Sequence, residues 1–234
     1  MKRAGIIGGL GPESTVEYYR LIVESYRGQR PDGSYPFVFI NSIDMTRMRL
    51  LIEADELGAV ADYLAAEVGR LAAAGADFGA LSANTPHLVF DELRSRSPLP
   101  LISIVEATRD AAAASGLRRL GLFGTRFTMR AGFYPEVFSR EGLTLVMPGD
   151  AEQGYIHDKY MNELIHGLFL PETRARLLEI ARRLKNEEGI QGLILGGTEL
   201  PLILRESDAD AAGVPFFDTT RIHVRRIVEQ LLSS

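Results

Sequence analysis

The sequence of 234 residues contains no cysteine. Disulfide bonds, a thiolate metal site and a thiol nucleophile are therefore excluded. No run of 18 apolar residues and no signal peptide are present either, so we expect a soluble, cytoplasmic protein without a membrane partner. Strong charge of one sign is also missing, because the net charge is −5 and the pI is about 5.5. We therefore expect no nucleic-acid partner and no attraction to an anionic membrane surface.

What the sequence does contain is an internal repeat. Similar short stretches recur after 113 to 116 residues. A period shared by three elements indicates a duplicated unit. The pairs are Ala4–Gly8 with Leu120–Gly124, Thr85 with Thr198, and Leu99–Ile104 with Val214–Asp218.

Apolar runs alternate with helical patterns along the chain, which predicts an α/β protein with parallel sheets and helices on both faces. Together with the repeat, this order predicts two similar parallel-sheet domains related by internal pseudo-symmetry, with an active-site cleft between them. The helix after the first strand is predicted to carry an apolar face formed by Val16, Tyr19, Val23 and Tyr26. The expected strands are 4–8, 37–43, 78–81, 99–104, 120–124, 144–147, 192–195 and 214–218.

The turn Gly9-Leu10-Gly11 follows the first expected strand. It begins like a dinucleotide-binding loop, but Ser14 replaces the third glycine and Pro12 removes an N–H that would hold phosphate. We therefore favour a tight turn that presents backbone N–H groups of Gly9, Leu10 and Gly11 to an anionic ligand. Thr125 occupies the place of Gly9 in the second half of the repeat and is a further candidate for ligand contact.

The stretch Leu81–His87 follows another expected strand. The amide of Asn84 and the hydroxyl of Thr85 are suited to gripping a carboxylate, and ligands of open α/β sheets bind at the carboxyl ends of strands. A plain strand-to-helix turn with these residues as caps is the alternative. The second copy of the motif, Leu195–Pro201, offers Thr198 at the matching position and favours ligand binding.

Three stretches, Ile6–Glu13, Asn84–His87 and Leu195–Pro201, together resemble the aspartate/glutamate (and hydantoin) racemase family over essentially the whole chain. The resemblance implies an amino-acid racemase or epimerase with two α/β domains around a cleft. It also implies homodimers and no cofactor, neither a metal nor pyridoxal phosphate. Because similar proteins exchange their last strands, it further implies one domain of residues 1–98 plus 210–234 and another of residues 99–209.

The resemblance also implies roles for individual residues. Asn84, Thr85 and Thr198 match family positions that hold the α-carboxylate of the substrate. Arg47 matches a position that can pair with a side-chain carboxylate. Family racemases use two cysteines, one on each face of the α-carbon, but Ala83 and Gly197 stand at those positions here. The two-thiol mechanism is therefore impossible for this chain.

Three other residues are candidates for acid or base chemistry. Ser82 precedes Ala83, although a hydroxyl without activation is a very weak base and could simply bind backbone. His87 could titrate near neutrality, or it could pack under the loop. Glu199 could act as a base, or it could cap the following helix, where the dipole favours a carboxylate.

Two functions from different classes follow. The first is an isomerase that acts on a small amino acid or dicarboxylate with a non-thiol acid and base. The second is a family member that has lost catalysis and binds a small carboxylate. A related decarboxylase or cis–trans isomerase is less favoured, because similar proteins with those activities also rely on a cysteine.

Overall fold

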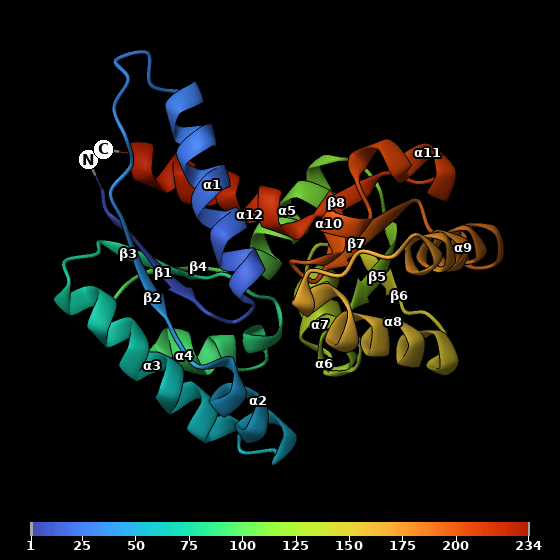
Figure 1. Ribbon diagram of the computed structural model, residues 1–234, viewed down its shortest axis with the longest axis horizontal. Helices are drawn as coiled ribbons and strands as arrows, with labels where there is room; N and C mark the ends of the chain where they lie inside the picture. The colour runs from blue at the N-terminus through green and yellow to red at the C-terminus, as the bar shows by residue number, and fades with distance from the viewer. Residues whose placement is uncertain (1, 234) are drawn as a thin grey trace. The chain divides into compact units, whose positions relative to one another are not determined.

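A computed structural model describes residues 2–233 of the chain (Figure 1). The chain divides into two compact units. Unit 1 comprises the residues up to Ile104 together with the stretch from Thr220 onward, and unit 2 comprises Val105–Thr219. Within residues 2–233, no helix combines the length and the apolar character needed to cross a membrane.

Unit 1 is built on a four-stranded parallel sheet in the order β2-β1-β3-β4. The central strands are continuous apolar or glycine runs, as expected for a parallel sheet covered on both faces. In register, Ile6 lies opposite Ile40 on one side and Ala80 on the other. The strands are β1 Ala4–Gly8, β2 Val38–Ser42, β3 Phe78–Leu81 and β4 Leu101–Ile102. The helices are α1 Pro12–Gly28, α2 Met45–Glu53, α3 Leu57–Ala73, η1 Thr85–Val89, α4 Phe90–Arg96 and α12 Thr219–Leu232.

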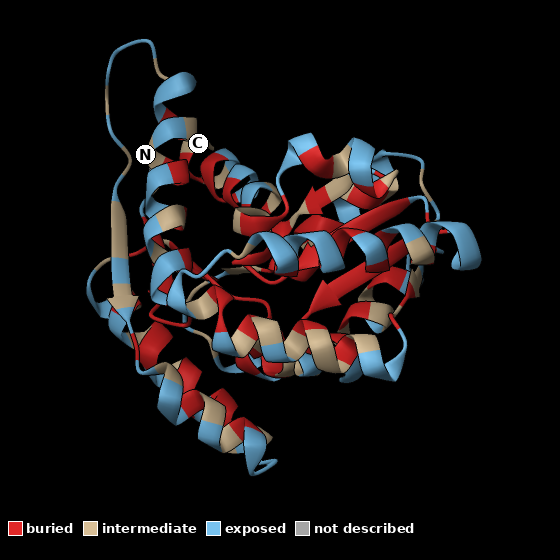
Figure 2. Cartoon of the chain, turned by 45° about the vertical axis from the view of Figure 1, so that its right-hand side comes forward, coloured by how far each residue is buried: buried red, intermediate tan, exposed pale blue. Residues whose placement is uncertain are grey.

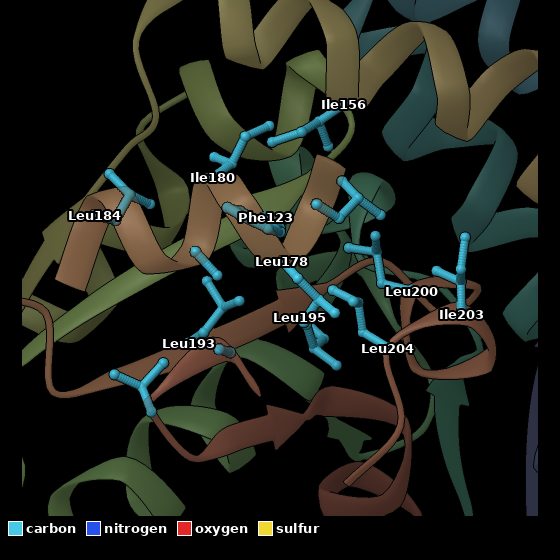
Figure 3. Close-up of a cluster of buried hydrophobic side chains, with 14 of the residues drawn as sticks. Phe123, Ile156, Leu178, Ile180, Leu184, Leu193, Leu195, Leu200, Ile203 and Leu204 are labelled. Carbon is cyan, nitrogen blue, oxygen red and sulfur yellow. The ribbon is translucent and has the colours of Figure 1, made fainter. Parts of the chain in front are cut away.

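Unit 2 contains a second four-stranded parallel sheet in the order β6-β5-β7-β8. Its strands are largely buried (Figure 2). Leucines of β7 pack against leucines of α9 in the main core cluster (Figure 3). The strands are β5 Arg119–Gly124, β6 Thr144–Val146, β7 Gly192–Gly196 and β8 Phe216–Asp218. The helices are α5 Ile104–Ala114, α6 Arg126–Arg130, α7 Phe133–Ser139, α8 Asp150–Asn162, η2 Leu164–His166, α9 Pro171–Glu188, α10 Leu200–Ile203, η3 Glu206–Asp208 and α11 Ala209–Ala212.

The predicted fold class is confirmed, because both sheets are parallel and flanked by helices. The expected exchange of last strands is wrong. β4 pairs with β3 in the first sheet, and β8 pairs with β7 in the second. The helices that follow these strands are exchanged instead, since α5 belongs almost wholly to unit 2 and α12 to unit 1.

Packing explains where α12 belongs. Its apolar residues Val224, Ile227, Val228 and Leu231 share one buried cluster with residues of β1, β3 and α1. Figure 1 shows α12 beside α1. In unit 2, a side-chain hydrogen bond joins Thr108 of α5 to Tyr134 of α7. Each of these two helices is therefore stabilised by contacts within the unit to which it belongs.

The buried face of α1 differs from the prediction. Tyr26 is buried as predicted, but Val16 and Tyr19 are 67% and 51% exposed, and Tyr18 and Ile22 are buried in their place. Tyr18 faces inward because its hydroxyl bonds the buried ring of His223 on α12, 2.8 Å away. The prediction of an amphipathic helix was therefore correct, but its buried face is rotated toward Tyr18 and Ile22 and keeps only Tyr26 of the predicted residues as fully buried.

Candidate functional site

In unit 1, the turn after β1 is held by its own hydrogen bonds. The Gly9 N–H donates to Oγ1 of Thr15 (2.9 Å), and this hydroxyl donates to the carbonyl of Gly11 (3.1 Å). The hydroxyl of Ser14 also donates to the Gly11 carbonyl, at 2.7 Å. The predicted tight turn is present, and Leu10 is buried in it. The Gly9 N–H, however, is directed to Thr15.

The turn after β3 contains Ser82, Ala83 and Asn84, all buried, followed by the partly exposed Thr85 at the start of η1. The hydroxyl of Ser82 donates to the Ile7 carbonyl at 3.0 Å. Ser82 therefore ties the end of β3 to β1, which is the structural role considered from the sequence. Asn84 and Thr85 lie at the carboxyl end of a parallel strand, where a ligand is expected.

His87 is buried in η1, and its ring stacks on Phe90 with 4.6 Å between centroids. Its Nε2 accepts a hydrogen bond from the N–H of Ile104 at 3.3 Å. Burial, together with the nearby His223 and Arg94, lowers the pKa of His87 to about 3, although hydrogen bonds to the backbone of Asn84 and Ala83 act in the opposite direction. His87 is therefore neutral at physiological pH, which differs from the expectation that it titrates near neutrality.

A second buried histidine, His223, contacts the same stretch of backbone, residues 102–104. Nε2 of His223 is 3.0 Å from the carbonyl of Ile102, and Nδ1 is 2.8 Å from the hydroxyl of Tyr18. Because a carbonyl can only accept, Nε2 carries the proton and Tyr18 donates to Nδ1. Burial lowers the pKa of His223 to about 4. Both histidines thus position residues 102–104, a role that no sequence spacing indicated.

Asp44 and Arg47 follow β2, and their side chains contact different groups. The carboxylate of Asp44 caps α2 by accepting the Thr46 N–H at 2.8 Å. The guanidinium of Arg47 lies 4.3 Å from the ring centroid of Tyr63. Arg47 is also exposed on α2.

In unit 2, the turn after β5 is a helix cap. Oγ1 of Thr125 accepts the N–H of Thr128 at 3.2 Å, and the two hydroxyls are 3.2 Å apart. Thr125 is buried at the N-terminus of α6, and the Arg126 N–H donates to Nδ1 of His157 at 3.3 Å. Thr125 thus positions the turn that corresponds to Gly9 in the first half.

The turn after β7 contains a buried polar cluster. The hydroxyl of Thr198 donates to Oε2 of Glu199 at 2.9 Å, and the hydroxyl of Tyr160, from α8, donates to the same oxygen. All three residues are buried. Glu199 stands at the start of α10 but makes no side-chain cap there, so its carboxylate serves Tyr160 and Thr198 instead. We refer to Tyr160, Thr198 and Glu199 as the β7 cluster.

Tyr160 is the residue of this cluster that sequence reasoning missed. Its pKa is raised well above the ordinary value for tyrosine, first by burial and then by the charge of Glu199, so it remains a protonated donor. It also fills the space beside Gly197, because a β-carbon there would lie 2.4 Å from Cε2 and 2.9 Å from the hydroxyl of Tyr160. The missing side chain at position 197 is therefore replaced in space by the tyrosine ring.

A β-carbon at position 197 is expected to destabilise the protein. Gly197→Ala should cost about 1–3 kcal/mol, because the buried ring of Tyr160 must move and weaken its bond to Glu199. Gly154→Ala on α8 is the matched control, since nothing lies within 4 Å of its added β-carbon. Urea unfolding of both variants provides the measurement. Equal stability of Gly197→Ala and wild type would show that Tyr160 does not occupy this space tightly.

The chain is similar to known proteins over almost its whole length. The sequence model of the Asp/Glu/hydantoin racemase family matches residues 7–227. The structure is similar to that of a putative Asp/Glu racemase from Yersinia pestis, with a TM-score of 0.90, 31% identity and coverage of 100% of both chains. An aspartate racemase homologue from Pyrococcus horikoshii gives a TM-score of 0.85 and 34% identity, again over 100% of both chains. The broad specificity amino-acid racemase of Bacillus subtilis is 23% identical over 236 residues, covering 98% of each chain.

Proposed function

Because the chain belongs to the Asp/Glu/hydantoin racemase family, we propose that it binds a small amino acid or dicarboxylate and acts on the proton of its α-carbon without thiols. The observation that carries the proposal is the buried carboxylate of Glu199 at the carboxyl end of β7. In parallel α/β sheets this edge is where ligands bind. A buried acid beside a permanent hydroxyl donor is a group that can exchange a proton.

The proposed carboxylate-binding residues are Asn84, Thr85 and Thr198, and Arg47 is proposed to pair with a side-chain carboxylate of the ligand. Family membership and the position of the first three at strand ends support this assignment. The hydroxyl hydrogen of Thr198 is directed to Glu199, so it has to turn toward a bound carboxylate. Its backbone N–H and hydroxyl then become the donors at this turn.

A second function has one specific observation in its favour. The chain has no cysteine, and its positions 83 and 197 carry alanine and glycine. A family member that binds a small carboxylate without converting it would need none of the lost thiols. Binding is common to both functions, so binding is tested first.

Calorimetric titration with the L- and D-forms of aspartate and glutamate, and with succinate, tests the proposal. We expect at least one of them to bind. Thr198→Val should weaken binding by roughly 10-fold or more, since a hydrogen bond to a charged group contributes about 1.5–3 kcal/mol. Thr144→Val, at an exposed position of β6, is the control and should leave affinity unchanged. If no binding is detected with any of these compounds, the proposed function is wrong.

A further inference from the structure

The β7 cluster joins two elements that are distant in sequence. Tyr160 comes from α8, whereas Thr198 and Glu199 follow β7. Both hydroxyls donate to one oxygen, Oε2 of Glu199. A carboxylate has about four lone-pair sites on its two oxygens, so a single oxygen can accept both of these hydrogen bonds.

Gly197 is part of the same arrangement. With no β-carbon at this position, the ring of Tyr160 packs against the end of β7 and its hydroxyl reaches Glu199. Any side chain at position 197 would push the ring away from this place. Gly197, Tyr160 and Glu199 therefore form one arrangement, in which the glycine provides room, the tyrosine donates a hydrogen bond and the glutamate accepts it.

We propose that Glu199 is the base that removes the α-proton of a bound amino acid, and that Tyr160 is the residue that positions it. This inference rests on the proposed function. In the step, the Cα–H bond breaks and its electron pair stays on the substrate, delocalised into the α-carboxyl group. The proton goes to Glu199. In the reverse step the same carboxyl group returns a proton to the α-carbon.

Glu199 would transfer a proton on only one face of the α-carbon. Racemisation needs a second group that delivers a proton to the opposite face of the α-carbon, and the residues at and around the other family cysteine position, Ala83, do not supply one. The methyl of Ala83 carries no exchangeable proton, and the hydroxyl of Ser82 is committed to the Ile7 carbonyl. His87 is buried and neutral, with Nε2 accepting from Ile104. While it is bound to Glu199, the abstracted proton exchanges with a proton of water. The carboxyl group then delivers this solvent-derived proton to the face from which the first one was taken, so the α-hydrogen is exchanged without inversion of the carbon.

The test is proton NMR in heavy water, combined with chiral chromatography of the same samples. Single enantiomers of aspartate and glutamate are incubated with the protein. We expect the α-hydrogen signal of one enantiomer to decay while its enantiomeric purity stays constant. Glu199→Gln should slow exchange by on the order of 10²–10⁴-fold, the contribution of a positioned base.

Tyr160→Phe keeps the ring beside Gly197 and removes only the hydroxyl. It should slow exchange by up to about 10²-fold, because the carboxylate is no longer held in position for the α-proton. It should also shift the apparent pKa of the pH–rate profile to a higher value, because the carboxylate becomes more basic when it loses a hydrogen-bond donor. Tyr155→Phe, on the same helix and partly exposed, is the control and should change neither. A purely structural tyrosine would alter stability without moving the pH profile.

The outcomes separate the two proposals. Formation of the opposite enantiomer, or exchange that survives Glu199→Gln, would overturn this inference. Calorimetric binding without any exchange would also overturn it while leaving ligand binding intact. If no ligand binds, the proposed function itself fails. If Glu199→Gln does not fold, Tyr160→Phe decides, because an unchanged rate and pH profile would contradict the assignment.

Discussion

Lowering the pH from 7 to 5 is expected to reduce the free energy of unfolding by about 4 kcal/mol, through His87 and His223 alone. Their folded-state pKa values are lowered to about 3 and about 4 by burial. In the unfolded chain a histidine titrates near 6.5. Between these values the unfolded state binds protons that the folded state does not, so stability is full above the unfolded pKa and falls as the pH decreases.

The size of the effect follows from linkage. Each histidine contributes a slope of about 1.4 kcal/mol per pH unit in this window. Carboxylates with lowered pKa values, such as Asp208 beside Arg174, lose their contribution only at lower pH. The range from pH 6.5 to 5 therefore isolates the histidines.

Urea unfolding at several pH values measures this slope. His223→Gln should roughly halve it, and His166→Gln, at an exposed position, should leave it unchanged. The absolute stability of His223→Gln at pH 7 is expected to be lower, because the bonds to Tyr18 and Ile102 are altered. Equal slopes in wild type and His223→Gln would show that this histidine is not buried in its neutral form.

Gly9→Ala is expected to destabilise the protein by about 2–5 kcal/mol, the sum of a left-handed backbone and overpacking. Gly9 has φ +76°, and an added β-carbon would lie 2.3 Å from the carbonyl oxygen and 2.7 Å from the nitrogen of Ile43. These atoms cannot move easily, because the Ile43 N–H donates to the Gly8 carbonyl at 2.9 Å.

Gly33→Ala is the matched control for this change. Gly33 has nearly the same φ, +73°, but nothing lies within 4 Å of its added β-carbon. It should therefore cost only about 1–2 kcal/mol, the backbone contribution alone. Urea unfolding of both variants gives the difference, which reports the close approach of the β1 turn to Ile43. Equal losses would mean that the turn is looser than its geometry indicates.

Much of the fold could be predicted because the central strands are short apolar runs bounded by turn residues. The predicted ranges of β1 and β3, Ala4–Gly8 and Phe78–Leu81, coincide with the observed strands. Such runs have few alternatives when they alternate with helical patterns. The placement of α12 was implied only by the family resemblance, because its own apolar face fits any sheet face of similar shape. Only packing against α1 and β1 decides it.

The candidate site was predictable only in part, for a related reason. Polar residues at strand ends, such as Asn84 and Thr198, are visible as motifs that interrupt apolar runs. Tyr160 belongs to no motif, and its role arises because Gly197 leaves room for its ring. For His87, the sequence left open whether the residue titrates near neutrality or packs under the loop, because a histidine in a polar turn does not show which elements cover it.

The central claim is that this chain keeps the fold of its family while lacking the thiol chemistry that racemisation uses. Each positioned acid or base supplies on the order of 10²–10⁴-fold in rate, so losing both thiols could forfeit up to roughly 10⁸-fold. The proposed base Glu199 would restore this contribution on one face of the α-carbon only, which does not suffice for inversion. Chiral chromatography of L-aspartate, D-aspartate and the two glutamates, each incubated with the unmodified protein, is the most direct measurement. We predict that every enantiomer stays pure. Steady formation of the opposite enantiomer over many turnovers would contradict the account.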